Sequence, residues 1–133
     1  MVKEFIAKSK EEWRRHLTSE QYEVCRKKDI ERPFSGEFNH CKEKGVYHCI
    51  CCENELFSSE TKFDSGTGWP SFGNPINQEN IVSETDSSYG MIRVEIMCSK
   101  CEAHLGHVFD DGPAPTNLRH CINSISLKLA KKD

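Results

Sequence analysis

Cysteine is the residue type in this sequence whose number and spacing most clearly indicate chemistry. The chain of 133 residues contains eight cysteines. Four of them form two C-x-x-C pairs, Cys49 with Cys52 and Cys98 with Cys101. Each pair can direct two thiolates at one ion, and two pairs complete the tetrahedral shell of a structural zinc site. The spacing therefore predicts one structural Zn²⁺ per chain, with no coordination position open for catalysis.

Two other interpretations of the paired cysteines stay open. Cys51 could replace Cys49 or Cys52 as a ligand, but only the pair of Cys49 and Cys52 matches the spacing of the second pair. The pairs could instead be free or redox-active dithiols, and a four-sulfur site can hold iron, as rubredoxin does.

The segment Met1–Lys10 has mixed charge and lacks the apolar core of a signal peptide. We therefore expect a cytoplasmic protein, in which metal binding or catalysis explains cysteines better than disulfides do.

Cys121 is the candidate nucleophile among the four remaining cysteines. A thiol attacks as its thiolate, and neighbouring cations favour that form. If the surrounding segment is a strand, His120 points to the opposite face, whereas Arg119 and Asn123 share the face of Cys121. Arg119 and Asn123 are then the expected helpers. The alternative is a cysteine that only packs in the core.

Two further groups could complete such a site. His104 and His107 lie three residues apart in an apolar segment, where they could perform acid–base chemistry beside a thiol or form structural hydrogen bonds. The loop 66–72 carries paired glycines and then Trp69, whose ring could hold a methyl group or pack in the core.

The elements that must position these residues change along the chain. Capping-box patterns at Ser9–Glu12 and Thr18–Gln21 predict two short helices, which must end before Pro33. Beyond Gly45 the apolar residues alternate, and strands are expected at 46–49, 91–97, 104–109 and 120–129. We expect a compact antiparallel β domain preceded by two helices.

Composition excludes several classes of function. The net charge is −3, which disfavours a nucleic-acid partner, and the basic residues of 128–132 are expected to be a solvated tail. Hydrophobic residues make up 36% of the chain, and no apolar run is long enough to span a membrane.

Taken together, the motifs closely resemble those of peptide-methionine (R)-S-oxide reductases, the B class of methionine sulfoxide reductases. The resemblance runs from about Thr18 to Leu127. The matching segments are Cys49-x-x-Cys52, 62–72, Cys98-x-x-Cys101, 104–113 and 119–124.

This resemblance implies one domain, 1–133, in which a helical region, 1–35, packs on a mainly β domain of two antiparallel sheets, 45–130. It also implies roles for individual residues. Cys121 would be the nucleophile. The sulfoxide would lie among His104, His107 and Asn123, with Arg119 near the thiolate, and Trp69 and Phe109 would bind the substrate. Zinc on the four paired cysteines would lie away from the active site.

The resemblance further implies a reaction and its partners. The Cys121 thiolate attacks the R epimer of methionine sulfoxide in oxidised proteins, His107 or His104 supplies a proton, and Cys121 becomes a sulfenic acid. Thioredoxin or a similar thiol reductant restores the enzyme, which we expect to be a monomer.

The sequence departs from the family pattern at Thr67. Many members have the resolving cysteine there. The candidates that remain are Cys25 and Cys41 in the N-terminal region, because Cys51 lies within the first zinc knuckle. An external thiol could also attack the sulfenic acid directly.

Two other functions remain as alternatives. A zinc-ribbon binding module or a rubredoxin-like electron carrier would explain the paired cysteines, but not Cys121 or the histidines.

Overall fold

The computed structural model describes residues 10–27, 32, 36–39, 41–87, 90, 92–114 and 116–131. Two short helices, α1 (Lys10–His16) and α2 (Ser19–Lys27), come first. The predicted capping box of α2 is present. The Thr18 amide donates to Gln21 Oε1 at 2.9 Å, and the Gln21 amide donates to Thr18 Oγ1 at 3.2 Å. These bonds satisfy amides that the first turn of a helix leaves without acceptors. The other predicted box begins at Ser9, outside the described residues.

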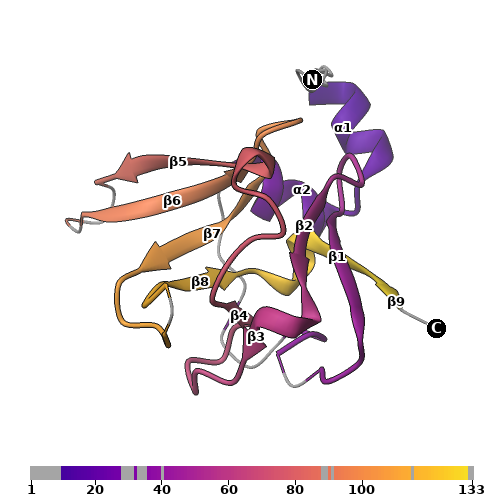
Figure 1. Ribbon diagram of the computed structural model, residues 1–133. Helices are drawn as coiled ribbons and strands as arrows, with labels where there is room; N and C mark the ends of the chain where they lie inside the picture. Colours follow the sequence, from indigo (N-terminus) through magenta and orange to yellow (C-terminus); the bar gives the residue numbers. More distant parts are fainter. Residues whose placement is uncertain are drawn as a thin grey trace.

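The strands form two antiparallel sheets, which confirms the predicted mainly β fold (Figure 1). The smaller sheet has the order β2–β1–β9, and the larger has the order β3–β4–β8–β7–β6–β5. Figure 1 shows α1 and α2 gathered at one end of the two sheets. The smaller sheet consists of β1 (Gly45–Cys49), β2 (Glu55–Ser58) and β9 (Leu127–Lys131). The larger sheet consists of β3 (Lys62–Phe63), β4 (Ser71–Phe72), β5 (Ile81–Asp86), β6 (Arg93–Cys98), β7 (His104–Phe109) and β8 (Arg119–Ile122). Short 3₁₀ helices lie at η1 (Ser59–Thr61), η2 (Gln78–Asn80) and η4 (Ser124–Ser126).

Aromatic side chains join the two sheets. Phe57 of β2 stacks on Phe72 of β4 with ring centroids 4.6 Å apart, and Tyr47 of β1 meets Phe72 edge-on at 5.2 Å. All three side chains are fully buried. Such ring pairs add to the stabilisation from buried area itself. Because β4 is hydrogen-bonded to β8, this packing also holds β8 against the smaller sheet.

Gly106 allows β7 and β8 to lie close together. Its position pairs with Ile122, and the next pair along the ladder is His107 with Cys121. A Cβ atom at Gly106 would overlap the carbonyl oxygen of Cys121. The absence of a side chain therefore lets β7 present His107 directly opposite Cys121.

The strand predicted over 120–129 is wrong as a single element. β8 ends at Ile122, η4 follows, and β9 then joins the other sheet beside β1. Polar side chains explain the break. Ser126 Oγ donates to the His104 carbonyl at 2.9 Å, and Asn123 Nδ2 donates to the Leu105 carbonyl at 3.1 Å. Short polar side chains that bond to nearby backbone compete with regular strand pairing.

β6 buries a carboxylate. The strand predicted from Met91 begins at Arg93, and Met91 itself lies outside the described residues. Ile92 is 84% exposed, whereas Glu95 is only 2% exposed. A buried carboxylate needs a hydrogen-bond partner, and the partner of Glu95 lies in the site described next.

None of the helices in the described part of the chain is long and apolar enough to cross a bilayer.

Candidate active site and metal centre

A pocket of about 210 Å³ opens beside Cys121. It draws together segments that are far apart in the sequence, from β6, β7, β8 and the loop between β3 and β4. Most of the residues expected around a reactive thiol are present. The lining consists of Thr67, Trp69, Arg93, Gly106, His107, Phe109, Arg119, Cys121 and Asn123.

Cys121 lies on the pocket face of β8, and His120 lies on the other face, as the alternation predicted. Cys121 is partly exposed and pairs with His107 on one side and with Ser71 of β4 on the other. His120 is buried in the core, where its Nδ1 donates to the Phe72 carbonyl at 3.1 Å. Burial lowers the pKa of His120 below its ordinary value. His120 is therefore a neutral core residue and not a helper of Cys121.

Arg119 is held in place beside the thiol. Its Nε and Nη2 donate to the two carboxylate oxygens of Asp111 at 2.8 and 3.2 Å. Its guanidinium lies over the ring of Phe109, 4.4 Å from the centroid. The hydrogen bond to Asp111, and to a smaller extent the charge of Cys121, raise the pKa of Arg119. The site thus has a fixed positive charge on the thiol's side of the pocket, which favours the thiolate.

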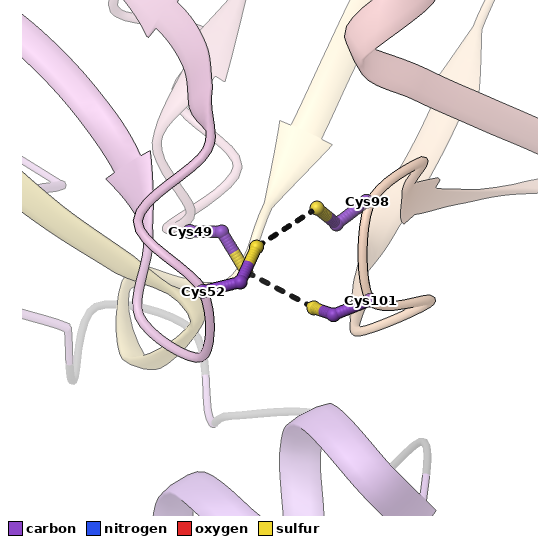
Figure 2. Close-up of side chains that lie close together, drawn as sticks. All are labelled: Cys49, Cys52, Cys98 and Cys101. Carbon is purple, nitrogen blue, oxygen red and sulfur yellow. Dashed lines mark hydrogen bonds between the residues drawn. The ribbon is translucent and has the colours of Figure 1, made fainter. Parts of the chain in front are cut away.

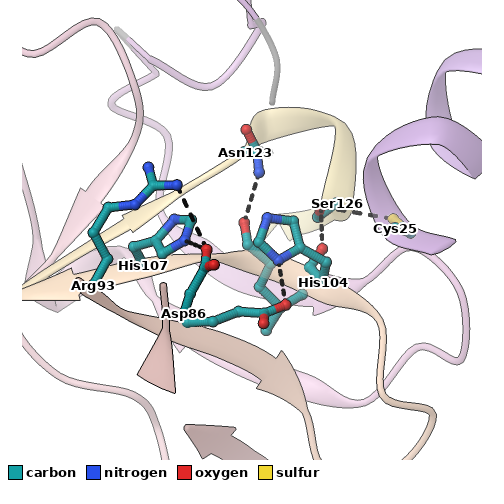
Figure 3. A network of polar contacts seen from close by, with 9 residues as sticks. Cys25, Asp86, Arg93, His104, His107, Asn123 and Ser126 are labelled. Atoms are coloured by element: carbon teal, nitrogen blue, oxygen red, sulfur yellow. Dashed lines mark hydrogen bonds and ion pairs between the residues drawn. The ribbon is translucent and has the colours of Figure 1, made fainter. Parts of the chain in front are cut away.

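His107 is oriented by a carboxylate. Its Nε2 lies 2.9 Å from Asp86 Oδ2, and Arg93 Nη2 lies 3.5 Å from the same oxygen (Figure 3). An ionised carboxylate can only accept, so the proton in this bond is on Nε2. Asp86 therefore fixes the tautomer and the orientation of the His107 ring.

His104 lies one layer behind His107. Its Nδ1 lies 2.8 Å from Glu95 Oε2, and each of these two residues is 2% exposed. The two imidazole rings are 5.5 Å apart and nearly perpendicular. His104 does not line the pocket of Cys121. It lines a separate cavity of about 410 Å³ beside Cys25 and α2. Its place in the structure is that of a buried support for His107.

The loop that carries Trp69 is braced by hydroxyl groups. Ser65 Oγ is 2.7 Å from Thr67 Oγ1 and 2.8 Å from Ser71 Oγ. Gly66 and Gly68 have φ values of 74° and 97°, in the left-handed region that favours glycine. Together these features fold the loop tightly enough to bring Trp69 and Thr67 to the pocket rim.

The four predicted metal ligands converge at the opposite end of β6 (Figure 2). Their sulfur atoms all lie within 4.8 Å of one another, with Cys49 to Cys101 at 3.7 Å and Cys52 to Cys98 at 3.5 Å. A tetrahedral Zn–S site with bonds of about 2.3 Å separates its sulfurs by about 3.8 Å. The donor set therefore fits a tetrahedral ion. Cys51 is not a member of this cluster, as the spacing predicted.

The two metal-binding turns are built alike. The residue after each pair, Glu53 and Glu102, has φ of 65° and 60°. Each donates its amide to the first cysteine's carbonyl at 2.8 Å, Glu53 to Cys49 and Glu102 to Cys98. The C-x-x-C spacing thus closes both turns in the same conformation and aims both pairs of thiols at one point.

Comparison with known proteins identifies the family of the chain. The SelR domain family matches residues 17–131. The chain belongs to the SelR family of methionine sulfoxide reductases.

Its curated relatives share the chain nearly end to end and are named peptide methionine sulfoxide reductase MsrB. The chain is 58% identical to the one from Hahella chejuensis over 128 residues, covering 96% of this chain and 92% of the relative. It is 59% identical to one from Pseudomonas fluorescens over 129 residues, covering 97% and 99%. The protein from Pseudomonas putida is 56% identical over 128 residues, covering 96% and 98%. The predicted oxidoreductase family is thereby confirmed.

In this SelR protein neither candidate resolving cysteine lines the pocket of Cys121. Cys25 is 2% exposed on α2, where its thiol donates to Ser126 Oγ at 3.6 Å (Figure 3). Cys41 is half-buried in a different cavity of about 310 Å³, which Lys62 and Phe63 of β3 also line.

The sequence interpretation missed the acidic residues of the site. Asp86, Glu95 and Asp111 each orient a residue that it had singled out, namely His107, His104 and Arg119. One signal was present: Arg93 and Glu95 occupy one face of an otherwise apolar strand. A polar face within a strand calls for partners across the sheet, although the sequence does not say which ones.

Proposed function

We propose that this SelR protein reduces the R epimer of methionine sulfoxide in oxidised proteins, with Cys121 as the nucleophile. The observation that carries the proposal is the register of β7 and β8, which sets an oriented histidine opposite a partly exposed thiol. The relatives' name, peptide methionine sulfoxide reductase, supports the substrate class. The choice of the R epimer rests on the sequence resemblance, since each epimer has its own enzyme class.

The first chemical step moves one oxygen atom from the substrate to the enzyme. The Cys121 thiolate attacks the sulfoxide sulfur while a proton is delivered to the oxygen. The sulfoxide is reduced to the thioether of methionine, and Cys121 is oxidised to a sulfenic acid. The charge of Arg119, which Asp111 fixes beside Cys121, favours the thiolate that makes this attack.

His107 is our choice for the proton donor. It lines the pocket, and the bond from its Nε2 to Asp86 orients the ring for proton transfer to the substrate. His104, the other candidate, acts behind it by orienting the ring of His107. Asn123 contributes a polar side chain anchored to β7 through the Leu105 carbonyl.

Trp69 and Phe109 would receive the methyl end of the substrate. Their rings line the pocket together with the polar residues that face the sulfoxide oxygen. Aromatic faces give a methyl group a large apolar contact, and they leave the oxygen to the hydrogen-bond donors. This division of the pocket holds the sulfoxide with one end polar and the other apolar.

For the return to the thiol we propose Cys41 as the resolving cysteine and thioredoxin, or a similar thiol reductant, as the partner. Phe63, Ser71 and Cys121 lie in one row across β3, β4 and β8. Neighbouring strands are about 4.8 Å apart, so the edge where Cys41 lies is about 10 Å from Cys121. Cys25 is more deeply buried and belongs to a helix. Attack by the Cys41 thiol on the sulfenic acid forms a disulfide and releases water.

Counting thiols after one turnover tests this assignment. Without reductant, one turnover of the unmodified protein should consume two thiols and give one methionine. The Cys41→Ser protein should give the same methionine but lose one thiol, and thioredoxin should recycle it slowly. Cys25→Ser is the matched control and should behave like the unmodified protein. Loss of two thiols in Cys41→Ser would assign another resolver. Loss of one thiol already in the unmodified protein would indicate attack by an external thiol.

The metal has a separate role in this proposal. Zn²⁺, one ion per chain, would be held by Cys49, Cys52, Cys98 and Cys101 and would supply a structural cross-link without taking part in the reaction. We further propose that residues 1–133 act as one domain, with 1–35 packed on 45–130, and that the protein works as a cytoplasmic monomer without a nucleic-acid partner.

The deciding experiment uses the reduced protein with a slight deficit of each sulfoxide epimer in a peptide and no reductant. We expect methionine from the R epimer only, and none from Cys121→Ser. Methionine from the S epimer would overturn the stereochemical assignment. Methionine from Cys121→Ser would overturn the nucleophile. No methionine from a folded, metal-loaded protein would leave a zinc-ribbon binding module as the better description.

A further inference from the structure

Arg26 of α2 connects the metal centre to both helices. Its Nη1 donates to the Cys101 carbonyl at 2.9 Å, and its Nη2 donates to Cys101 Sγ at 3.3 Å. Its guanidinium also lies over the ring of Trp13 on α1, 4.1 Å from the centroid. Trp13 is 4% exposed, so this contact is within the packed part of the helices. One side chain thus contacts a metal ligand and α1 at once.

The charge of a filled four-cysteine site makes this contact important. Four thiolates around a divalent cation leave a net charge of −2, which lies largely on the sulfur atoms. The site is mostly buried, and charges there are screened less than in water. Asn54 Nδ2, a neutral donor, lies 3.6 Å from Cys98 Sγ. Arg26 brings a full positive charge to Cys101, and its guanidinium stays protonated over the whole range in which the protein functions.

The two helices also pack on other elements and on each other. α2 packs on β7 and on η4, and α1 packs on α2. The bond from Arg26 to Cys101 is therefore a direct polar link between α2 and the second metal-binding turn. The link is strongest when Cys101 Sγ belongs to an anionic metal–thiolate cluster, because a hydrogen bond between two charged groups is stronger than one between neutral groups.

We propose that Arg26 raises the affinity of the four-cysteine site for zinc and thereby makes the packing of α1 and α2 depend on the bound ion. The coupling is reciprocal by thermodynamic necessity: if zinc strengthens the docking of the helices, docked helices strengthen the binding of zinc. This role is independent of the reaction at Cys121. Arg26 lies on α2 and is not a metal ligand, but it would contribute to the affinity of the site for the metal.

The test compares zinc affinity in matched arginine variants of the full chain. The holoprotein is titrated with a chromophoric chelator, and the zinc dissociation constant is obtained from the competition. Arg26→Gln should bind zinc about 10- to 100-fold more weakly, the range found when a hydrogen-bond partner of a metal ligand is removed. Arg14→Gln is the control, because Arg14 also joins the helices, with its guanidinium 5.0 Å from the Tyr22 ring. We expect its zinc affinity to be unchanged.

A second variant and a second readout guard against simple misfolding. Arg26→Lys keeps the charge but loses the planar fork and the stacking on Trp13, so an intermediate loss of affinity is expected. Hydrogen exchange of the zinc-loaded Arg26→Gln protein should be faster in α1 and α2 and unchanged in β7 and β8. If Arg26→Gln and Arg26→Lys both bind zinc as tightly as the unmodified chain, the proposal is overturned. An equal loss in Arg14→Gln would also overturn it, by showing that the loss of affinity does not depend on the contact of Arg26 with Cys101.

Discussion

At the scale of single residues, the site works through pairs. The residues that would carry the chemistry, Arg119 and His107, are each held by a carboxylate, Asp111 and Asp86. A charged hydrogen bond is short and strong, so it fixes the geometry of its partner. The side chains that do not touch substrate therefore decide how well those that do can act.

Asp86 gives the sharpest test at this scale. Asp86→Asn keeps the shape but replaces the carboxylate that orients His107 with a neutral amide, so proton delivery should slow. We expect kcat to fall about 10- to 100-fold, less than the full effect of losing an acid–base group, with little change in KM. Glu84→Gln is the control, since Glu84 is an exposed carboxylate on the same strand. A kcat that stays the same in Asp86→Asn would contradict this role.

His120 predicts how stability depends on pH. Its pKa is lowered by burial, so below the ordinary value of 6.5 the unfolded chain takes up a proton that the folded chain does not. The contribution of His120 to stability is thus complete above about pH 6.5 and decreases as the pH falls, by at most about 1.4 kcal/mol per pH unit.

Urea unfolding at about pH 7.5 and about pH 5.5 measures this contribution. His120→Gln keeps a donor for the Phe72 carbonyl but does not titrate, so it should lose less stability than the unmodified chain between these pH values. The metal thiolates titrate in both proteins and cancel in the comparison. Equal losses in the two proteins would show that His120 does not carry this dependence.

At the scale of elements, the strand register that pairs His107 with Cys121 depends on how closely β7 approaches β8. Gly106 makes that approach possible, and β4 supports β8 from the other side through two residue pairs. The break between β8 and β9 is equally important. η4 sends the chain to the smaller sheet and leaves Asn123 at the pocket.

Gly106→Ala tests the close approach. A Cβ there would overlap the Cys121 carbonyl, a backbone atom that cannot move without shifting β8. We expect a loss of about 1–3 kcal/mol in the free energy of unfolding and a larger fractional loss of activity. Gly73→Ala is the control, because the nearest atom to a Cβ at Gly73 is 3.9 Å away. If both substitutions were equally mild, β7 and β8 would be less tightly constrained than we infer.

At the scale of the whole molecule, the metal centre joins the two sheets. Cys49 ends β1 of the smaller sheet, and Cys98 ends β6 of the larger one. In a chain of this size the core alone gives limited stability, so a cross-link between the sheets has a large effect. The pocket of Cys121 lies elsewhere on the larger sheet, and none of the four cysteines lines it.

Removal of the metal should therefore lower stability before it changes chemistry. Elemental analysis is expected to give one zinc per chain and a colourless protein, and a coloured protein would indicate iron. Chelation should lower Tm by more than about 10 °C. Cys51→Ser is the matched control, because it should keep the metal and have nearly the same Tm as the unmodified chain. Cys52→Ser should lose the metal and have a lower Tm. Retention of the metal by Cys52→Ser would show that Cys51 is a ligand.

The sequence by itself determined the features that rest on short-range geometry. The spacing within each C-x-x-C pair identified the metal ligands, the alternation along a strand separated Cys121 and Arg119 from His120, and Thr18 and Gln21 marked the start of α2. Each of these depends on residues within one turn or one strand, where backbone geometry fixes the relative directions of side chains.

Only the tertiary structure decided which residues meet across the chain. Asp86 reaches His107, Glu95 reaches His104, and Arg26 reaches Cys101 because strand register and helix packing place them together. The end of β8 at Ile122 was decided in the same way, by bonds from Asn123 and Ser126 to β7. Such contacts join residues 9 to 75 positions apart. No local pattern encodes them, because they follow from the packing of all the elements at once.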